Sequence, residues 1–155
     1  MHPNCVAIDR ILESFGAAGR VRMLPEAAPT AVAAARQVGV DVGAIANSLV
    51  FRTAEDEPLL VMTSGAHRVD TTKVAALVGT ARLSRADADF VRIATGQPIG
   101  GVAPLGHPAP IRTLIDIALA EHPRVWAAGG IPHAVFPTTY EELLRITAGR
   151  ATEVA

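Results

Sequence analysis

The chain has 155 residues, half of them apolar, so it is long enough to bury one hydrophobic core and too short for two, and we predict one domain spanning 1–155. Its formal net charge of −1 argues against an autonomous binder of long nucleic acid and gives no reason to expect a DNA partner, although a module that grips only a nucleic-acid end needs no basic excess. The single cysteine, Cys5, excludes a disulfide framework. The sequence shows no signal-like start and no apolar run of membrane-spanning length, so we expect a cytoplasmic protein without a membrane partner.

Hydrophobic spacing predicts a succession of helices and strands. Apolar residues three or four apart predict a helix, whereas alternating or continuous short apolar runs predict a strand. In chain order these are a helix over 6–16, a strand over 20–23, a helix over 31–38, strands over 49–53 and 58–63, helices over 71–78 and 84–94, strands over 111–116, 124–128 and 134–136, and a last helix ending near 149. Residues 150–155 are expected to fray.

Side chains that can accept from free backbone amides mark the helix starts. Thr30 and Asp70 stand directly before two of the helices, and the stretch 84–87 is a variant of the capping box that we expect to open another. The last helix has two candidate caps, Thr138 with a glutamate three residues on, or Thr139 with the next glutamate.

Helices and strands alternate irregularly, without repeated βαβ units, and the acidic connection 55–57 joins two strands as a hairpin. Hairpins pair their strands antiparallel. We therefore predict an α+β (mixed α/β) fold, in which helices flank a central mixed, largely antiparallel sheet.

The stretch 96–110, named here the glycine/proline loop, contains four glycines and four prolines. Glycine lets backbone amides approach a ligand closely, and proline fixes the backbone while removing donors. Connections this long without secondary structure are uncommon in compact domains, except where they bind something. We interpret the loop as the wall of a binding site, the alternative being an ordinary surface connection.

Several reaction classes lack their motifs. The chain has no Walker-type loop, no dinucleotide fingerprint, no HExxH pattern and no GxSxG elbow. The five histidines never occur at i,i+4 spacing with a carboxylate partner, so we expect no metal site. None of the motifs present calls for an organic cofactor either.

Five other residues are at candidate binding positions. Asn47 and Ser48 stand where a strand begins, and their short polar side chains either point into a cleft or satisfy local backbone groups. For Ser64, at a strand end, the preferred interpretation is a serine that stabilises a turn, and the alternative is a substrate contact. A second glycine and proline connection begins at Gly129 and ends at His133, and it either faces the glycine/proline loop across one pocket or is a tight hairpin turn. His133 either donates to a substrate carbonyl or phosphate or is simply solvated.

Four segments together resemble the YbaK/EbsC family of trans-editing aminoacyl-tRNA deacylases, which is related to the editing domain of bacterial prolyl-tRNA synthetase. The segments are NSLVF at 47–51, RVDTTKVAALVG at 68–79, TGQPIGGVAPLG at 95–106 and WAAGG at 126–130. Their order and spacing extend over nearly the whole chain, and the GxxxP core from Gly100 to Pro104 is the most specific part.

The resemblance implies a pocket for the aminoacylated 3′ end of a tRNA, usually proline tRNA carrying alanine or cysteine, whose ester is hydrolysed. The expected partners are the acceptor end of aminoacyl-tRNA and, as a second candidate, an aminoacyl-tRNA synthetase. Asn47, Gly100 and Gly101 are the implied catalytic positions, because loop amides would hold the substrate carbonyl. The implied substrate-binding residues are Ser48, Ser64, Ala103, Pro104, Gly129 and His133. We further expect Gly101→Val to damage activity more than stability.

One position departs from the family pattern. Better-known members carry a lysine where this chain has Asn47, and the only lysine of the chain, Lys73, lies elsewhere. An arginine such as Arg52 or Arg68 could supply the charge, or specificity could differ. The alternative functions are a non-catalytic module that binds an aminoacyl-tRNA end or an amino-acid-like ligand, and an unrelated small-molecule hydrolase.

Overall fold

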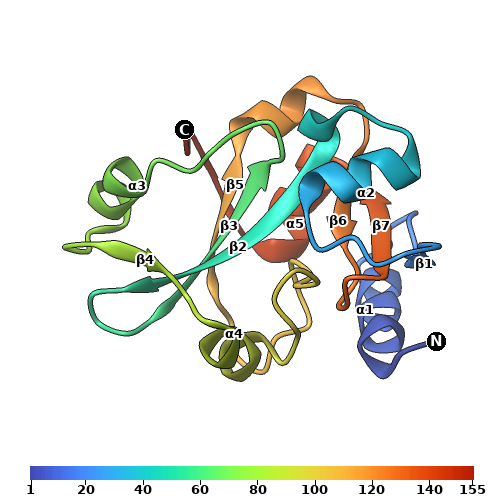
Figure 1. Ribbon diagram of the computed structural model, residues 1–155, viewed down its shortest axis with the longest axis horizontal. Coiled ribbons are helices and arrows are strands. Elements are labelled where there is room, and N and C mark those ends of the chain that lie inside the picture. Colours follow the sequence, from blue (N-terminus) through green and yellow to red (C-terminus); the bar gives the residue numbers. More distant parts are fainter.

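The computed structural model describes residues 1–155 and contains five α-helices, two short 3-10 helices and eight strands (Figure 1). The strands are β1 (Arg22–Met23), β2 (Ile45–Thr53), β3 (Pro58–Ser64), β4 (Leu83–Arg85), β5 (Arg112–Asp116), β6 (Val125–Ala128), β7 (Ala134–Thr138) and β8 (Arg150–Thr152). The helices are α1 (Pro3–Ser14), α2 (Ala31–Val38), η1 (Val42–Ala44), α3 (Thr71–Val78), α4 (Ala88–Thr95), η2 (Ile117–Glu121) and α5 (Tyr140–Thr147).

All eight strands belong to one sheet. Its order is β1-β7-β6-β2-β3-β5-β8, and β4 pairs with β2 beside this path. Four pairings are antiparallel, and the pairings β2–β6, β3–β5 and β5–β8 are parallel. The mixed sheet flanked by helices confirms the predicted fold class.

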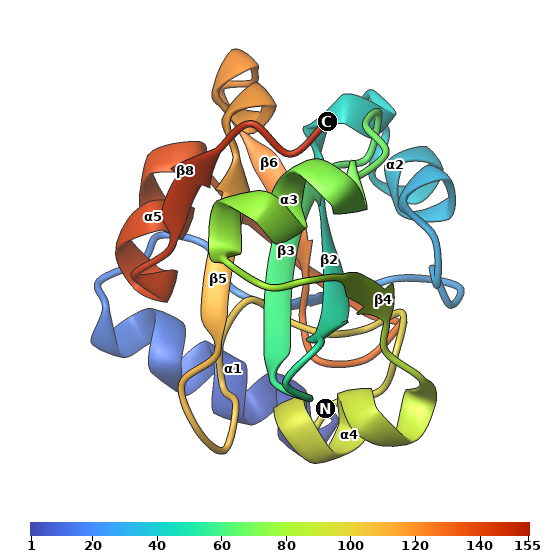
Figure 2. The same cartoon turned by 90° about the vertical axis from the view of Figure 1, so that its left-hand side faces the viewer.

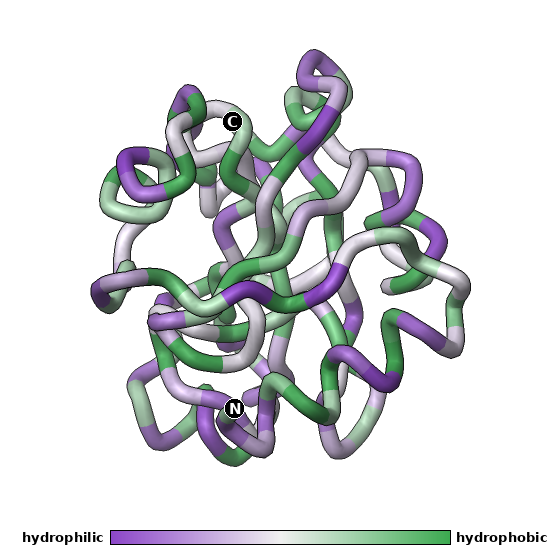
Figure 3. Tube along the Cα trace, turned by 90° about the vertical axis from the view of Figure 1, so that its right-hand side faces the viewer, coloured by the Kyte–Doolittle hydropathy of each residue, from purple (hydrophilic) through white to green (hydrophobic).

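The two faces of the sheet are covered by different helices (Figure 2). Successive strand residues point to opposite faces, so Ala46 and Val50 of β2 join a core of 22 buried residues with α1, α5 and the glycine/proline loop. On the other face, Ile45 packs under α2 and Phe51 packs under α3, in two smaller clusters. Asn47, on that same face, belongs to neither cluster. Hydrophilic residues gather mainly on the outer loops and helices (Figure 3). None of the helices combines the length and the hydrophobicity that a membrane span requires.

Local signals place most helix ends correctly. The Thr30 hydroxyl accepts from the Ala33 amide, and Asp70 caps α3 in the same way. Of the two candidates for α5, Thr139 is the cap, and the Thr138 hydroxyl donates to the Glu142 carboxylate instead. Helix α1 begins three residues before the predicted start, because the Nδ1 atom of His2 accepts from the Asn4 amide.

Three sequence predictions are wrong, each through long-range pairing. Residues 84 and 85 belong to strand β4 and do not open a helix, because they pair with the far end of β2, and Asp87 caps α4. Strand β2 already begins at Ile45, where β6 pairs with it. The expected frayed tail is ordered, since β8 pairs with β5 and Val154 is fully buried.

Candidate functional site

Strand β2 has an open edge in the middle of the sheet. On the side away from β3, β6 pairs with β2 only at Ile45 and Ala46, and β4 pairs only from Phe51 to Thr53. Residues 47–50 therefore have a neighbouring strand on the β3 side alone. We call this stretch the β2 gap.

Backbone polar groups point into the β2 gap. The Ile45 carbonyl accepts from Gly65 on the β3 side, and the Val50 carbonyl accepts from Ala86 on the opposite side. Because the N–H and C=O groups alternate in direction along a strand, those of Ser48 face the gap, as those of Val50 do. Because the Val50 carbonyl is paired with Ala86, the open part of this strand edge is at Ser48, where a ligand can form hydrogen bonds.

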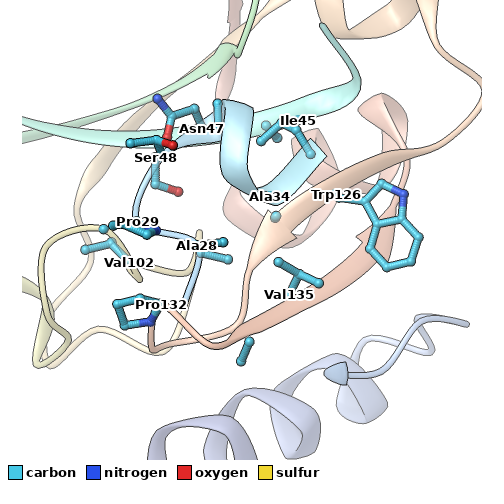
Figure 4. Close-up of a pocket in the computed structure, with 17 residues that line it drawn as sticks. Ala28, Pro29, Ala34, Ile45, Asn47, Ser48, Val102, Trp126, Pro132 and Val135 are labelled. Carbon is cyan, nitrogen blue, oxygen red and sulfur yellow. The ribbon is translucent and has the colours of Figure 1, made fainter. Parts of the chain in front are cut away.

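A hollow with about 430 Å³ of empty space, part of it open to solvent, lies against the β2 gap (Figure 4). We call it the main hollow. Figure 4 shows Asn47 and Ser48 on one side of it, with Pro132 and Val135 on another. None of its 17 lining residues is charged, and seven are alanines. They are Ala28, Pro29, Thr30, Ala31, Ala34, Ile45, Ala46, Asn47, Ser48, Gly100, Val102, Trp126, Ala127, Ala128, Pro132, Ala134 and Val135.

Three of the sequence-predicted site residues meet in this hollow: Asn47, Ser48 and Gly100. They also line an adjoining hollow that extends along the gap toward β4 and adds Arg85 to the wall. The side-chain amide of Asn47 makes no hydrogen bond to protein groups, whereas the Ser48 hydroxyl donates weakly to the Met62 sulfur at 3.0 Å. Asn47 therefore keeps its full hydrogen-bonding capacity for a ligand.

Two loop amides at the main hollow are unpaired. The backbone N–H groups of Gly100 and Val102 donate to no other protein group. Val102 is only 3% exposed. Buried backbone N–H groups are almost always paired, so a free one beside a hollow indicates a position that a ligand or water oxygen fills.

The other predicted loop residues hold the loop in shape. The Gly101 amide donates to the Pro98 carbonyl at 3.0 Å, and the Ala103 amide donates to the Gln97 side chain at 2.6 Å. Neither amide is therefore free to bind a substrate oxygen. Pro104 is buried and does not line the main hollow.

Gly101 also brings two loops together. A Cβ atom built there would lie 2.3 Å from the Ile131 carbonyl carbon and 2.5 Å from the Pro132 nitrogen. Only glycine allows the glycine/proline loop to approach the 129–133 connection this closely. The prediction that Gly101→Val spares stability is wrong, because the atoms that a side chain would meet belong to the backbone of the other loop.

His107 fastens the far end of the glycine/proline loop. Its Nε2 atom lies 2.9 Å from the Ala103 carbonyl oxygen and donates to it in the matching tautomer. Burial lowers the pKa of His107 below its usual 6.5, against a smaller upward effect of this hydrogen bond. The ring is therefore neutral at neutral pH.

Ser64, Gly129 and His133 lie outside the main hollow. Ser64 is buried, and its hydroxyl donates to the Gly43 carbonyl at 2.9 Å. Gly129 is buried at a turn, donating to the Ala134 carbonyl, and the His133 side chain is exposed. From this second connection it is Pro132 that reaches the hollow.

A buried carboxylate organises the region behind Ser64. Asp116 accepts from the Ser64 amide at 2.9 Å and from the Ala118 amide at 3.0 Å, and it contacts His67 Nδ1 at 2.9 Å. The Ser64 hydroxyl donates to the Gly43 carbonyl and accepts from the Ala66 amide. It has no base as a partner, so this cluster does not form a nucleophile and base pair. No group of three or more His, Cys, Asp or Glu side chains is arranged to hold a metal ion.

The N-terminus of α2 reaches the main hollow through Thr30 and Ala31. Thr30 satisfies only the Ala33 amide, so the amides of Ala31 and Val32 stay unpaired. A helix N-terminus carries a partial positive charge and favours oxygen atoms of a ligand. Sequence reasoning found Thr30 as a cap but had no signal that this cap stands beside Asn47, nor that Trp126 and Val135 complete the wall.

Comparison with known proteins gives a consistent relationship. A sequence model of the aminoacyl-tRNA editing domain matches residues 25–146. The chain is 30% identical over 110 residues to the uncharacterised protein YwhH of Bacillus subtilis (strain 168). The matched residues make up 71% of this chain and 69% of YwhH.

Two solved structures share the whole fold. One, described as the crystal structure of a candidate trans-editing enzyme for prolyl tRNA synthetase, is 39% identical with a TM-score of 0.91, over 99% of this chain and 98% of that chain. The other, from work on grafting linear epitopes onto scaffold proteins, is 37% identical with a TM-score of 0.90, over 99% and 97% of the two chains.

Proposed function

The chain belongs to the aminoacyl-tRNA editing domain family, and from that premise we propose that it is a trans-acting deacylase of the YbaK/EbsC type, which hydrolyses the ester of mischarged tRNA. The proposed substrate is proline tRNA that carries a wrong small amino acid. A similar structure described as a candidate trans-editing enzyme for prolyl tRNA synthetase supports this choice.

The observation that carries the proposal is the pair of free amides at Gly100 and Val102. Ester hydrolysis develops negative charge on the carbonyl oxygen, and donors fixed before the reaction stabilise it without reorganisation. One such donor is worth about 2.7–4 kcal/mol in other hydrolases. In this proposal the two amides bind the carbonyl oxygen of the aminoacyl ester.

The wall of the main hollow suits a small aminoacyl group. Seven alanines and no charged residue line it, so a short apolar side chain is accommodated without an unpaired charge. Asn47 is the free polar side chain at the edge and would orient the terminal ribose through neutral hydrogen bonds.

The attacking group in this proposal is water. No histidine or carboxylate lines the hollow, and the Ser48 hydroxyl has no base beside it, so the protein offers no activated nucleophile there. Catalysis then rests on positioning the ester and stabilising the oxyanion, with substrate hydroxyl or thiol groups assisting.

The second candidate is a binding module without catalysis. The uncharged lining favours it, because a hollow without a cation or a base can bind an aminoacyl-tRNA end and leave its ester intact. Both functions predict binding of charged tRNA, and only the first predicts release of the amino acid.

The deciding experiment measures amino-acid release from Ala-, Cys- and Ser-charged proline tRNA. If the parent protein is active, Asn47→Ala should lower the rate about tenfold, since a lost hydrogen bond costs about 0.5–1.5 kcal/mol and the misplaced ester adds to this. If the parent is inactive, Asn47→Lys should restore turnover by supplying a charge-assisted contact.

The matched control is Lys73→Ala, because Lys73 is the only lysine and is remote from the hollow. It contacts Glu153 at 3.2 Å and the Ala155 carbonyl at 3.0 Å. Its replacement should leave the rate unchanged. Full activity in Asn47→Ala would remove Asn47 from the site, and intact charged tRNAs with every variant would exclude the deacylase.

A further inference from the structure

Arg85 stands at the border of the β2 gap. It is the last residue of β4 and pairs with Phe51, directly beyond the open stretch of β2. It lines the adjoining hollow together with Asn47, Ser48 and Gly100. No other residue that lines the two hollows is charged.

The guanidinium of Arg85 is held without being neutralised. It lies 5.9 Å from the centre of the Phe51 ring, and Phe51 is itself buried. It forms no ion pair and no hydrogen bond with protein groups, and the residue is exposed. Stacking on an aromatic ring restricts the side chain but leaves all five N–H donors for a ligand.

Arg52, on the same corner of the sheet, is in the opposite situation. It follows Phe51 in β2 and so points to the other face, where it stacks on Phe90 at 4.9 Å. Its Nε atom donates to the Asp56 carboxylate at 2.8 Å. Arg52 therefore has a partner already, and Arg85 is the free cation beside the site.

The position of Arg85 fits the RNA backbone. From Ala46, where β6 ends the gap, to Phe51 is about 17 Å of strand, long enough for an aminoacyl ester, its ribose and the phosphate that follows. The planar fork of arginine matches two phosphate oxygens. We propose that Arg85 binds a phosphodiester group at the 3′ end of the tRNA whose ester occupies the main hollow, an inference that rests on the proposed function.

The test compares a substrate with phosphates and one without. Alanyl-tRNA contains the phosphodiesters, whereas alanyl-adenosine contains only the ester, ribose and base. Arg85→Gln should raise KM for alanyl-tRNA about tenfold with little change in kcat, as expected for one charge-assisted contact. Arg85→Gln should leave the hydrolysis of alanyl-adenosine unchanged. Arg85→Lys should recover part of the loss in KM for alanyl-tRNA. Arg52→Gln should hydrolyse both substrates as the parent does.

A binding measurement keeps the inference independent of catalysis. A fluorescent, uncharged single-stranded RNA ending in CCA should bind Arg85→Gln more weakly than the parent, with a log–log salt slope smaller by about 0.7. Equal losses on both substrates, or RNA binding that Arg85→Gln leaves unchanged, would overturn the role of Arg85. If the parent hydrolyses neither substrate, the deacylase proposal fails, and RNA binding alone decides Arg85.

Discussion

Replacing Gly101 with alanine tests the contact that joins the two loops around the main hollow. The added Cβ would lie 2.3 Å from the Ile131 carbonyl carbon and 2.6 Å from the Ile131 Cα, whereas ordinary contacts begin near 3.4 Å. The loops must therefore separate by about 1 Å, and inserting one methyl group into a packed contact costs about 1–3 kcal/mol. Because the opposing atoms are backbone, we expect a loss near 3 kcal/mol.

The same displacement should affect function more strongly. Gly101 lies between Gly100 and Val102, whose amides are proposed to hold the ester carbonyl, and a shift of about 1 Å at such a site can cost about a hundredfold in rate. Urea denaturation gives the loss of stability, and hydrolysis of Ala-charged proline tRNA, assayed at a temperature where the variant is folded, gives the loss of activity.

Gly79→Ala is the matched control. Gly79 ends α3 with φ +78°, and a Cβ atom there would meet nothing within 4 Å. It should cost about 1 kcal/mol from backbone strain alone and leave activity unchanged. A Gly101→Ala protein as stable as the parent would refute the close approach of the loops, and a destabilised variant with full activity would refute the proposed role of the flanking amides.

Three further outcomes follow from buried groups. Burial lowers the pKa of His107 below 6.5, so as pH falls the unfolded chain binds a proton at this histidine before the folded protein does. The protein should therefore lose stability as pH falls below about 6.5. Measurements of Tm against pH should show a weaker dependence for His107→Gln. Burial, aided by Asp9, raises the pKa of the Cys5 thiol, so a thiol reagent at neutral pH should label Cys5 only after unfolding. Val154→Ala should lower the free energy of unfolding by about 1–2 kcal/mol, whereas a frayed tail would show no loss in urea titration.

Local chemistry determined what the sequence could predict. Thr30 and Asp70 cap their helices whatever lies around them, because each side chain reaches an amide three residues on. Gly39 and Gly79 end helices because they adopt positive φ at no steric cost. The hairpin of β2 and β3 likewise needs only a short connection between two apolar runs. For the site, sequence and family resemblance together singled out Asn47, Ser48 and Gly100, which line one hollow in the structure.

Tertiary structure decided where those residues leave backbone groups unpaired. The β2 gap exists because β6 and β4, distant from each other in the chain, pair with opposite ends of β2. The same long-range pairing turns Arg85 from an expected helix residue into the border of the site. The spacing of residues in the sequence predicts neither the gap nor the position of Arg85, because the hydrogen bonds of a strand edge depend on which distant segment packs beside it. The free energy that selects this segment comes from the burial of a shared hydrophobic core.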